Sequence, residues 1–402
     1  MARFEPFPGI RFDHDLVNLA AVTAPPYDVL SADDIAALRA DRPHNVTWID
    51  CPDKTDAGYA DAGRLMREWI DEGYLTIDEP AFYAYRMGFK DDAGRAHQTS
   101  GILGALELMK PGDGDVLPHE RTTPKDVSDR LNLLRSTHAN LSPVWGLSMA
   151  KGLGAFAEMP GQPINRWTSD DGVHHRLYRI DEPAVVAAIS AAVASAPVVI
   201  ADGHHRYHTC LEYRNEWRGA HGDVAGGHDL TLCFMVELSA DQLFVQAIHR
   251  LLRAVPDGFE TKLTEFFDLF DAGVVDASTL AKMDDAGALC LVRTDGTGTL
   301  MRPKAGAFDG VDDLDSARLA HVLASIAPDT EVVYQHGVDK ILGRLGIGDA
   351  SHTGTADADA AVLLRPVPVP TIEAFANERK LMPPKSTFFA PKPRTGVILR
   401  QL

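Results

Sequence analysis

The chain has 402 residues, 45% of them hydrophobic, and a formal net charge of −18 at pH 7. This length can bury a large core and predicts two or three structural units, or one long domain. The negative charge argues against a general nucleic-acid binder and against anionic membranes as partners, because the field of the protein repels phosphate groups. A phosphorylated ligand therefore needs a local pocket of basic residues.

The cysteines Cys51, Cys210, Cys233 and Cys290 are far apart and form no C-x-x-C pair, which indicates neither a zinc ribbon nor a disulfide framework. The first residues, M-A-R-F-E-P-F-P-G, lack the apolar region of a signal peptide. No apolar run reaches the roughly 18 residues of a membrane-spanning helix. We expect a soluble, cytoplasmic protein with no nucleic-acid or membrane partner. The sequence leaves the oligomeric state open, with a homodimer among the options.

In chain order, the apolar periodicity predicts a mixed α/β protein of the α+β kind, with mixed sheets flanked by helices. Strands are expected at 45–50, 81–86, 99–106, 144–147, 175–180, 198–200, 230–238, 244–248, 288–294, 332–334 and 360–364. Helices are expected at 31–39, 59–72, 183–194, 207–217, 260–270, 314–325, 338–345 and 371–377. Residues 1–150, 151–255 and 256–402 are expected to form an N-terminal α/β region, a phosphate-binding region and a C-terminal α/β region, unless the chain is one continuous domain.

The most informative stretch is A-P-V-V-I-A-D-G-H-H-R-Y, at 196–207. Val198–Ile200 predict a buried strand and Tyr207 starts a helical pattern, so Asp202–Arg206 fall on a strand-to-helix turn. Gly203 permits the sharp reversal, and the free N–H groups of a helix start attract anions.

The side chains of this turn suggest chemistry as well as shape. His204, His205 and Arg206 can hold phosphate beside the helix start. Asp202 can hold a metal ion or accept a proton. The alternative is a structural turn whose polar residues are merely solvated.

Two further polar clusters lack an amphipathic period. The first is H-E-R-T-T-P-K-D at 119–126, followed by Asp129 and Arg130, in which Thr123 is expected to cap a helix beginning at Pro124. A solvated loop is the alternative, although a base, an acid, a cation and a hydroxyl in adjacent places are unusual for inert surface. The second is P-P-K-S-T at 383–387. It lacks the glycines of a P-loop, so Lys385, Ser386 and Thr387 either close on a phosphate or belong to a Pro-rich terminal strand.

Together these motifs resemble the bacterial and archaeal family known as domain of unknown function 1015. The matching stretches, spread in the same order over nearly the whole chain, are P-P-Y-D-V at Tyr27, H-E-R-T and D-R at Glu120 and Arg130, I-A-D-G-H-H-R-Y at Asp202, and M-P-P-K-S-T-F-F at Lys385. The D-G-H-H-R box also resembles the phosphate-binding strand-turn-helix of the ParB/sulfiredoxin-like fold, which includes kinases of free serine. That resemblance implies a phosphotransferase acting on serine.

For a phosphotransferase, the residues divide into three roles. Glu120 is the candidate base, with His119 as its rival. Gly203, His204, His205 and Arg206 would hold the donor phosphates, and Asp202 would hold Mg²⁺. Arg121, Arg130, Lys385, Ser386 and Thr387 would close over the transferred group. ATP, ADP or pyrophosphate is the expected donor and serine the acceptor, or the reaction runs in reverse on phosphoserine.

Two other functions fit parts of the pattern. His204 and His208 lie four residues apart and His205 adjoins them, a spacing that suits zinc in a metal-dependent hydrolase. Arg206 inside the cluster would repel that metal ion. A non-catalytic nucleotide-sensing module would keep the phosphate cradle and would not need Glu120.

Overall fold

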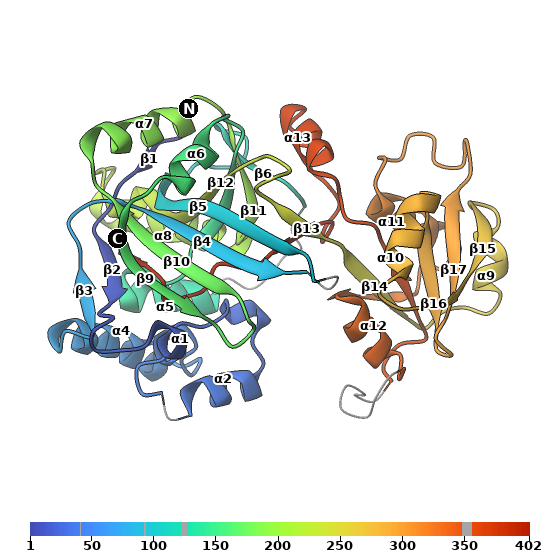
Figure 1. Cartoon of the computed structure of the whole chain (residues 1–402), viewed down its shortest axis with the longest axis horizontal. Coiled ribbons are helices and arrows are strands. Elements are labelled where there is room, and N and C mark those ends of the chain that lie inside the picture. Colours follow the sequence, from blue (N-terminus) through green and yellow to red (C-terminus); the bar gives the residue numbers. More distant parts are fainter. Residues whose placement is uncertain (41, 92–93, 122–127, 348–355) are drawn as a thin grey trace. The chain divides into compact units, whose positions relative to one another are not determined.

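The computed structural model describes residues 1–402 except 41, 92–93, 122–127 and 348–355, and Figure 1 labels its elements. Contacts group the chain into two compact units. Unit 1 consists of residues 1–244, 373–381 and 391–402, and unit 2 of residues 245–372 and 382–390. The mixed α/β class predicted from the sequence is confirmed. The three regions stay a prediction of boundaries, and the main sheet of unit 1 contains strands from the first two of them.

In the described part of unit 1, the main sheet has the strand order β6-β11-β8-β12-β5-β4-β10-β9, and β1 pairs with β5. Its strands are β1 (Phe4–Glu5), β4 (Phe82–Lys90), β5 (Ala96–Glu107), β6 (Val116–Pro118), β8 (Val144–Ser148), β9 (Gln162–Thr168), β10 (His174–Ile180), β11 (Val198–Asp202) and β12 (Leu230–Glu237). Most neighbours are antiparallel, but β6 runs parallel to β11 and β8 runs parallel to β12. The first pairing positions the site described below.

A second sheet of unit 1 has the order β3-β2-β21-β7. Its strands are β2 (Gly9–Phe12), β3 (Leu75–Ile77), β7 (Ala139–Asn140) and β21 (Leu399–Gln401). Because β21 lies between β2 and β7, the two ends of the chain are tied into one sheet.

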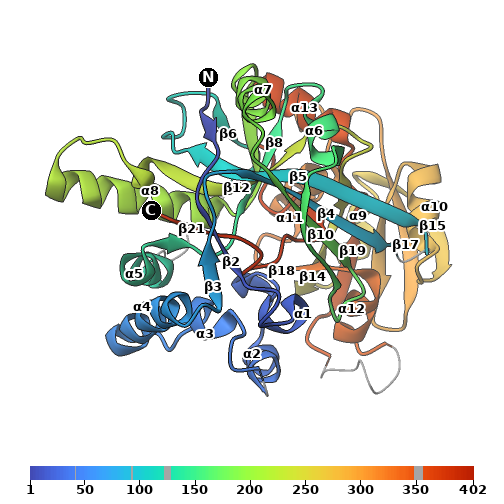
Figure 2. The ribbon, with the colours of Figure 1, turned by 60° about the vertical axis from the view of Figure 1, so that its left-hand side comes forward.

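The helices of unit 1 pack on these sheets and on one another. They are α1 (Leu19–Val22), η1 (Tyr27–Val29), α2 (Ala32–Arg39), α3 (Thr47–Asp50), α4 (Asp56–Asp71), α5 (Ser128–Thr137), α6 (Leu153–Glu158), α7 (Pro183–Ala194), α8 (His204–His221) and η2 (Gly227–Asp229). In Figure 2, α5 lies between α4 and α8 and packs on both. The apolar core of the unit includes Ile200 of β11, Leu134 of α5 and Tyr207 of α8. The start of α8 is therefore held against a strand and a second helix.

Unit 2 has a six-stranded sheet, within the residues described, with the order β15-β17-β16-β19-β14-β18. Its strands are β14 (Ile248–Arg253), β15 (Phe267–Val274), β16 (Leu289–Arg293), β17 (Thr297–Pro303), β18 (Glu331–His336) and β19 (Ala360–Leu363), and β13 (Phe244–Gln246) pairs with β20 (Phe388–Ala390). Its helices are α9 (Phe259–Leu263), α10 (Thr279–Ala286), α11 (Asp315–Ile326) and α12 (Val338–Arg344), and the boundary between the units falls within α13 (Val369–Asn377).

The sheet of unit 2 is covered on both faces. Leu251 and Leu252 are consecutive in β14 and belong to different apolar clusters, because successive side chains of a strand point to opposite faces. Leu252 packs in the cluster that contains α11, and Leu251 in the cluster that contains α12. Across both units, the described residues contain no helix long and apolar enough to cross a membrane.

Two predicted elements were wrong. The strand expected at 45–50 is a short helix, α3, since the Asn45 side chain accepts from Thr47 N at 3.0 Å and donates to Ala21 O at 2.7 Å, which fixes a turn. The helix expected at 260–270 ends at Leu263, and β15 begins at Phe267, where pairing with β17 takes over. Short apolar runs do not by themselves distinguish the two states.

Two element boundaries also differ from the prediction. His249 and Arg250, expected at the end of a strand, lie inside β14 and are buried. Helix α8 begins at His204 rather than Tyr207, so His204, His205 and Arg206 form its first turn. The predicted strand-to-helix turn is present, but its basic side chains belong to the helix.

Candidate functional site

The site lies where two parallel strands end side by side. Val116 is opposite Val198 and Pro118 is opposite Ile200 in the β6–β11 pairing. His119 and Glu120 follow β6 directly, and the Asp202–Gly203 turn follows β11. Parallel neighbours end at the same edge of a sheet, so His119 and Glu120 meet the Asp202–Gly203 turn at this edge. Such an edge is the usual place for ligands in α/β sheets.

The turn between β11 and α8 requires glycine. Gly203 has φ 83° and ψ 26°, in the left-handed region. A Cβ atom at this position would also lie about 3.0 Å from the guanidinium of Arg206. Gly203 provides no side-chain cap, so the first turn of this 18-residue helix presents its backbone N–H groups, with the positive end of the helix dipole, at the sheet edge.

Three side chains gather beside this helix start. Nδ1 of His119 lies 2.7 Å from the carbonyl oxygen of Ile200, which can only accept, so Nδ1 carries the proton. Nε2 of His119 lies 3.6 Å from a carboxylate oxygen of Glu120, whose side chain is 12% exposed. The imidazole rings of His119 and His204 have centroids 5.0 Å apart. The imidazoles of His119 and His204 and the carboxylate of Glu120 therefore lie close together.

His204 is a neutral imidazole in this setting. Burial, with a smaller contribution from nearby His119, lowers its pKa to about 3. Its Nε2 atom is buried and has no hydrogen-bond partner among the described residues. At pH 7 His204 therefore offers one donor and one acceptor and no charge.

Asp202 is held between two cations. Arg206 Nη2 donates to Asp202 Oδ2 at 2.8 Å, and Lys392 Nζ donates to Oδ1. Burial opposes ionisation, but Lys392 and Arg206 hold the pKa of Asp202 well below its usual range. Both carboxylate oxygens accept from cations that would repel a divalent ion, so this arrangement does not fit the predicted role of Asp202 as a Mg²⁺ ligand.

Lys392 was not assigned a role from the sequence. It stands in the tail between Pro391 and Pro393, seven residues beyond Lys385. Only its contact with Asp202 identifies it as part of the site. The signal that could have found it is the need of a buried aspartate for a second cation.

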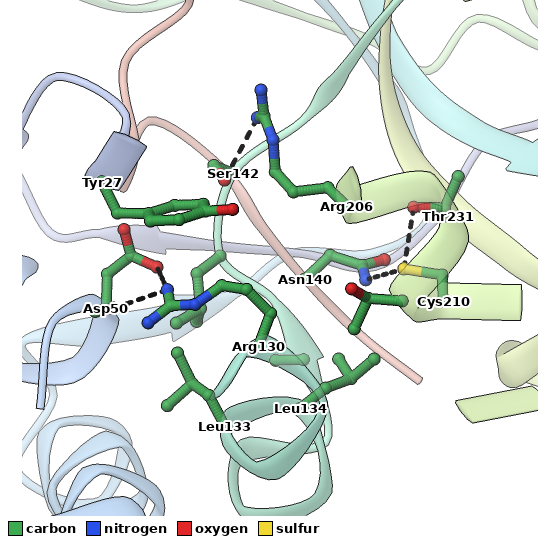
Figure 3. Close-up of a pocket in the computed structure, with 13 residues that line it drawn as sticks. Tyr27, Asp50, Arg130, Leu133, Leu134, Asn140, Ser142, Arg206, Cys210 and Thr231 are labelled. Carbon is green, nitrogen blue, oxygen red and sulfur yellow. Dashed lines mark hydrogen bonds and ion pairs between the residues drawn. The ribbon is translucent and has the colours of Figure 1, made fainter. Parts of the chain in front are cut away.

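Arg206 connects the helix start to a cavity of about 50 Å³ in unit 1. Its Nη1 atom donates to Ser142 Oγ at 3.3 Å and to the carbonyl of Pro143. Figure 3 shows Tyr27 with its hydroxyl on the side of Ser142 and Arg206, above the pair of Asp50 and Arg130. Burial raises the pKa of Tyr27, so its hydroxyl stays protonated at neutral pH.

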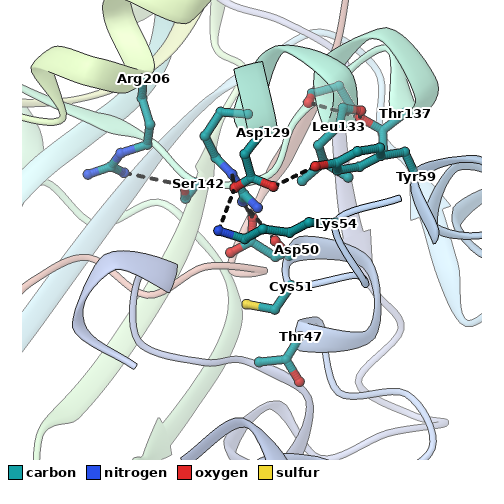
Figure 4. Close-up of polar contacts among 12 residues, drawn as sticks. Thr47, Asp50, Cys51, Lys54, Tyr59, Asp129, Leu133, Thr137, Ser142 and Arg206 are labelled. Carbon is teal, nitrogen blue, oxygen red and sulfur yellow. Dashed lines mark hydrogen bonds and ion pairs between the residues drawn. The ribbon is translucent and has the colours of Figure 1, made fainter. Parts of the chain in front are cut away.

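Arg130 is paired with two carboxylates on the other side of this cavity. Its Nη1 atom donates to the Asp50 carbonyl at 2.7 Å and to Asp50 Oδ1 at 3.1 Å, and its Nε donates to Asp129 Oδ2 at 3.0 Å. Figure 4 shows that Tyr59 and Lys54 also contact Asp129.

The Arg130 guanidinium lies 4.2 Å from the centre of the Tyr27 ring. Burial raises the pKa of Asp50 although Arg130 is adjacent. The Tyr27 ring thus covers a buried ion pair.

The other predicted residues are placed as follows. Arg121 is exposed, and His205 is partly buried in the first turn of α8. The predicted cap Thr123 and helix start Pro124 lie outside the described residues. Lys385 is exposed in unit 2, where Ser386 and Thr387 are buried. That Lys385, Ser386 and Thr387 close on the same phosphate as the Asp202–Arg206 turn stays a prediction.

The zinc alternative depended on the four-residue spacing of His204 and His208. Both lie on α8, but the side chain of His208 is 56% exposed and 3.8 Å from Glu212, whereas Nε2 of His204 is buried. Within the part of the chain that the structure describes, no three His, Cys, Asp or Glu side chains are grouped as metal ligands.

Comparison with known proteins shows the family. The family model described as "Protein of unknown function (DUF1015)" matches residues 4–317, so the chain belongs to this family, as its motifs predicted. No match was found among curated proteins.

Three of the solved structures that resemble it do so distantly. A conserved hypothetical protein from Pyrococcus furiosus has a TM-score of 0.37 at 11% identity, over 70% of this chain and 90% of that one. A free serine kinase in complex with AMP has a TM-score of 0.37 at 12% identity, over 70% of this chain and 88% of that one. SbnI with a C-terminal truncation, from Staphylococcus aureus, has a TM-score of 0.38 at 10% identity, over 72% of this chain and 84% of that one. At this distance the similarities assign no activity or ligand to the chain.

Proposed function

We propose that unit 1 is a phosphotransferase that moves a phosphoryl group between a polyphosphate donor and the hydroxyl of free serine. The observation that supports this most is the parallel pairing of β6 with β11. It puts the Glu120 carboxylate beside the start of α8, where backbone N–H groups and a helix dipole favour phosphate. Serine as the acceptor comes from the resemblance of the D-G-H-H-R box to kinases of free serine.

The donor phosphates are proposed to bind at the first turn of α8. Buried Nε2 of His204 is a polar atom without a partner in the described residues, and a phosphate oxygen would satisfy it. Arg206 and Lys392 supply the positive charge, while Asp202 holds both in place. Phosphoryl transfer needs little beyond such positioning and neutralisation.

Glu120 is proposed as the base. The serine oxygen forms a bond to phosphorus, the bond from phosphorus to the leaving phosphate oxygen breaks, and Glu120 takes the serine hydroxyl proton. His119, whose Nε2 lies 3.6 Å from Glu120, orients that carboxylate when Nε2 is protonated as well as Nδ1. With water as the acceptor and phosphoserine as the donor, the same groups would remove the phosphate.

Phosphorus NMR of the full chain tests this proposal directly. The protein is incubated with L-serine and ATP, ADP or pyrophosphate, with and without Mg²⁺, and separately with phosphoserine. We expect the phosphoserine resonance to grow with one donor and to be absent with Glu120→Gln. Glu216→Gln, at an exposed position further along α8, is the matched control. The proposal would be refuted if the phosphorus spectrum showed no reaction with any of the three donors or with phosphoserine.

A further inference from the structure

The cavity beside Arg206 is small, and polar and apolar side chains share its lining. Its volume of about 50 Å³ has room for about three to five water molecules. That space is too small for a nucleotide and limits a ligand to a few non-hydrogen atoms, of the order of the smallest amino acids. Its polar wall is made by Tyr27, Asp50, Arg130, Ser142 and Arg206, and leucines of α5 complete it.

The charges around the cavity cancel. The carboxylates of Asp50, Asp129 and Asp202 face the cations of Arg130, Arg206 and Lys392, and none of these six side chains is more than 20% exposed. Lys54 also reaches Asp129, at 3.8 Å, but it is 75% exposed and screened by solvent. A buried cluster with three negative and three positive groups favours a ligand without net charge over a free anion or cation.

The two ends of the cavity differ in sign. Asp50 is 4% exposed, and within the described chain the hydrogen bonds to its carboxylate come from one side, at Oδ1 from Arg130. Across the cavity lies Arg206, whose Nη1 atom donates to Ser142 Oγ and to the carbonyl of Pro143. An ammonium group suits the first end and a carboxylate suits the second, since each then meets an opposite charge out of bulk water.

We infer that this cavity binds a small zwitterionic amino acid, with the ammonium group paired to Asp50 and the carboxylate paired to Arg206. Tyr27 covers the ligand and its hydroxyl hydrogen-bonds to it. This inference rests on the proposed function only in making the amino acid the phosphoryl acceptor, because binding can be measured without turnover. Arg206 then serves both ligands, through Asp202 towards the helix start and through the positive charge of its guanidinium towards the amino acid.

Titration calorimetry on the full chain, with no donor present, tests the pairing. L-serine is compared with 3-hydroxypropionate, which lacks the ammonium group, and with ethanolamine, which lacks the carboxylate. We expect L-serine to bind at least about 10-fold more tightly than either, the effect of one lost charge-assisted hydrogen bond. Equal affinity for L-serine and 3-hydroxypropionate, or no binding of L-serine, would overturn the inference.

Asp50→Asn should weaken L-serine at least about 10-fold and leave 3-hydroxypropionate unchanged. Asp229→Asn is the matched control, because Asp229 is also buried and paired with an arginine, Arg218, at 2.7 Å. Should Asp50→Asn unfold, Tyr27→Phe, which removes one hydroxyl, should weaken L-serine by about 2- to 10-fold. An equal loss for both ligands in Asp50→Asn, or no loss in Tyr27→Phe, contradicts the pairing.

The outcome is separable from the fate of the proposed function. Asp50-dependent binding of L-serine without phosphoserine formation would refute phosphoryl transfer and leave the amino-acid site standing. Phosphoserine formation with an unchanged KM for serine in Asp50→Asn would support phosphoryl transfer and refute the amino-acid site at Asp50.

Discussion

Two polar motifs of this chain end in very different surroundings. At the start of α8, Asp202 meets the cations Arg206 and Lys392, and the Glu120 carboxylate lies beside His119. In the Pro383–Thr387 segment of unit 2, the Ser386 hydroxyl instead contacts a second hydroxyl and a backbone carbonyl. There Ser386 Oγ lies 2.8 Å from Ser316 Oγ and donates to the Pro383 carbonyl at 2.7 Å.

The difference teaches how to interpret a polar cluster in a sequence. Lys385 has a left-handed backbone, with φ 57°, and its carbonyl accepts from Arg250 at 3.0 Å. Such contacts fix the path of the chain. At α8 the cost of burying several charges is met by mutual pairing, which a fold has little reason to keep without a ligand. Four experiments test this contrast, in order of decreasing effect.

Glu120→Gln should lower turnover by about 10²–10⁴ because it removes the base while keeping shape and hydrogen-bonding reach. Donor affinity, measured by calorimetry, should stay nearly unchanged. His119→Asn is measured in parallel, and its loss should be smaller because His119 acts through Glu120. Full activity in Glu120→Gln with loss in His119→Asn would transfer the role of base to His119, and full activity in both would return the cluster to a solvated loop.

Arg206→Ala should weaken binding of the phosphate donor by roughly 1.5–3 kcal/mol, or about 10- to 150-fold, the effect of a charge-assisted hydrogen bond. The matched variant is Arg250→Ala in unit 2, where the guanidinium donates to the carbonyls of Ile248 and Lys385. That variant should lower the free energy of unfolding and leave donor affinity unchanged. If Arg206→Ala binds the donor normally, the phosphate contact lies elsewhere.

Local patterns predicted much of this fold, and long-range contacts account for what was missed. The β-branched run Val198–Ile200 and the Asp202–Gly203 pair were sufficient to place a strand and a turn. Nothing local indicates that β6 pairs with β11 about 80 residues away, so the meeting of Glu120 with α8 was inferred only from the need to concentrate cations. Asp50 was missed because its segment was taken for a strand, and Lys392 because its partner is 190 residues distant.

The pH dependence of stability should report the buried imidazole of His204. The unfolded residue binds a proton below about pH 6.5, whereas the folded one, with its pKa lowered to about 3, stays neutral. Its contribution to stability is therefore complete above pH 6.5 and declines as the pH falls towards 3, by at most about 1.4 kcal/mol per pH unit.

Denaturant unfolding between pH 4 and 7 measures this slope, and His204→Asn should reduce it. His175, whose pKa burial also lowers to about 3, keeps its own share of the slope in that variant. His208→Asn, at an exposed position of the same helix, controls for the loss of a helical histidine. An unchanged slope in His204→Asn would mean that the imidazole is hydrated and not the buried, neutral group described here.

The smallest effect concerns the tail motif. Ser386→Ala should lower the free energy of unfolding by about 1 kcal/mol, because Ser386 is buried at 4% exposure and shares its hydroxyl with Ser316 and the Pro383 carbonyl. Ser316→Ala removes the same contact from the other side, so the double variant should lose less than the sum of the two single variants. Calorimetry with the donor decides between the two roles. Additive losses of stability, together with weaker donor binding in Ser386→Ala, would indicate that the Pro383–Thr387 motif contacts the phosphate. Non-additive losses with unchanged donor affinity would indicate that the motif has a structural role in unit 2.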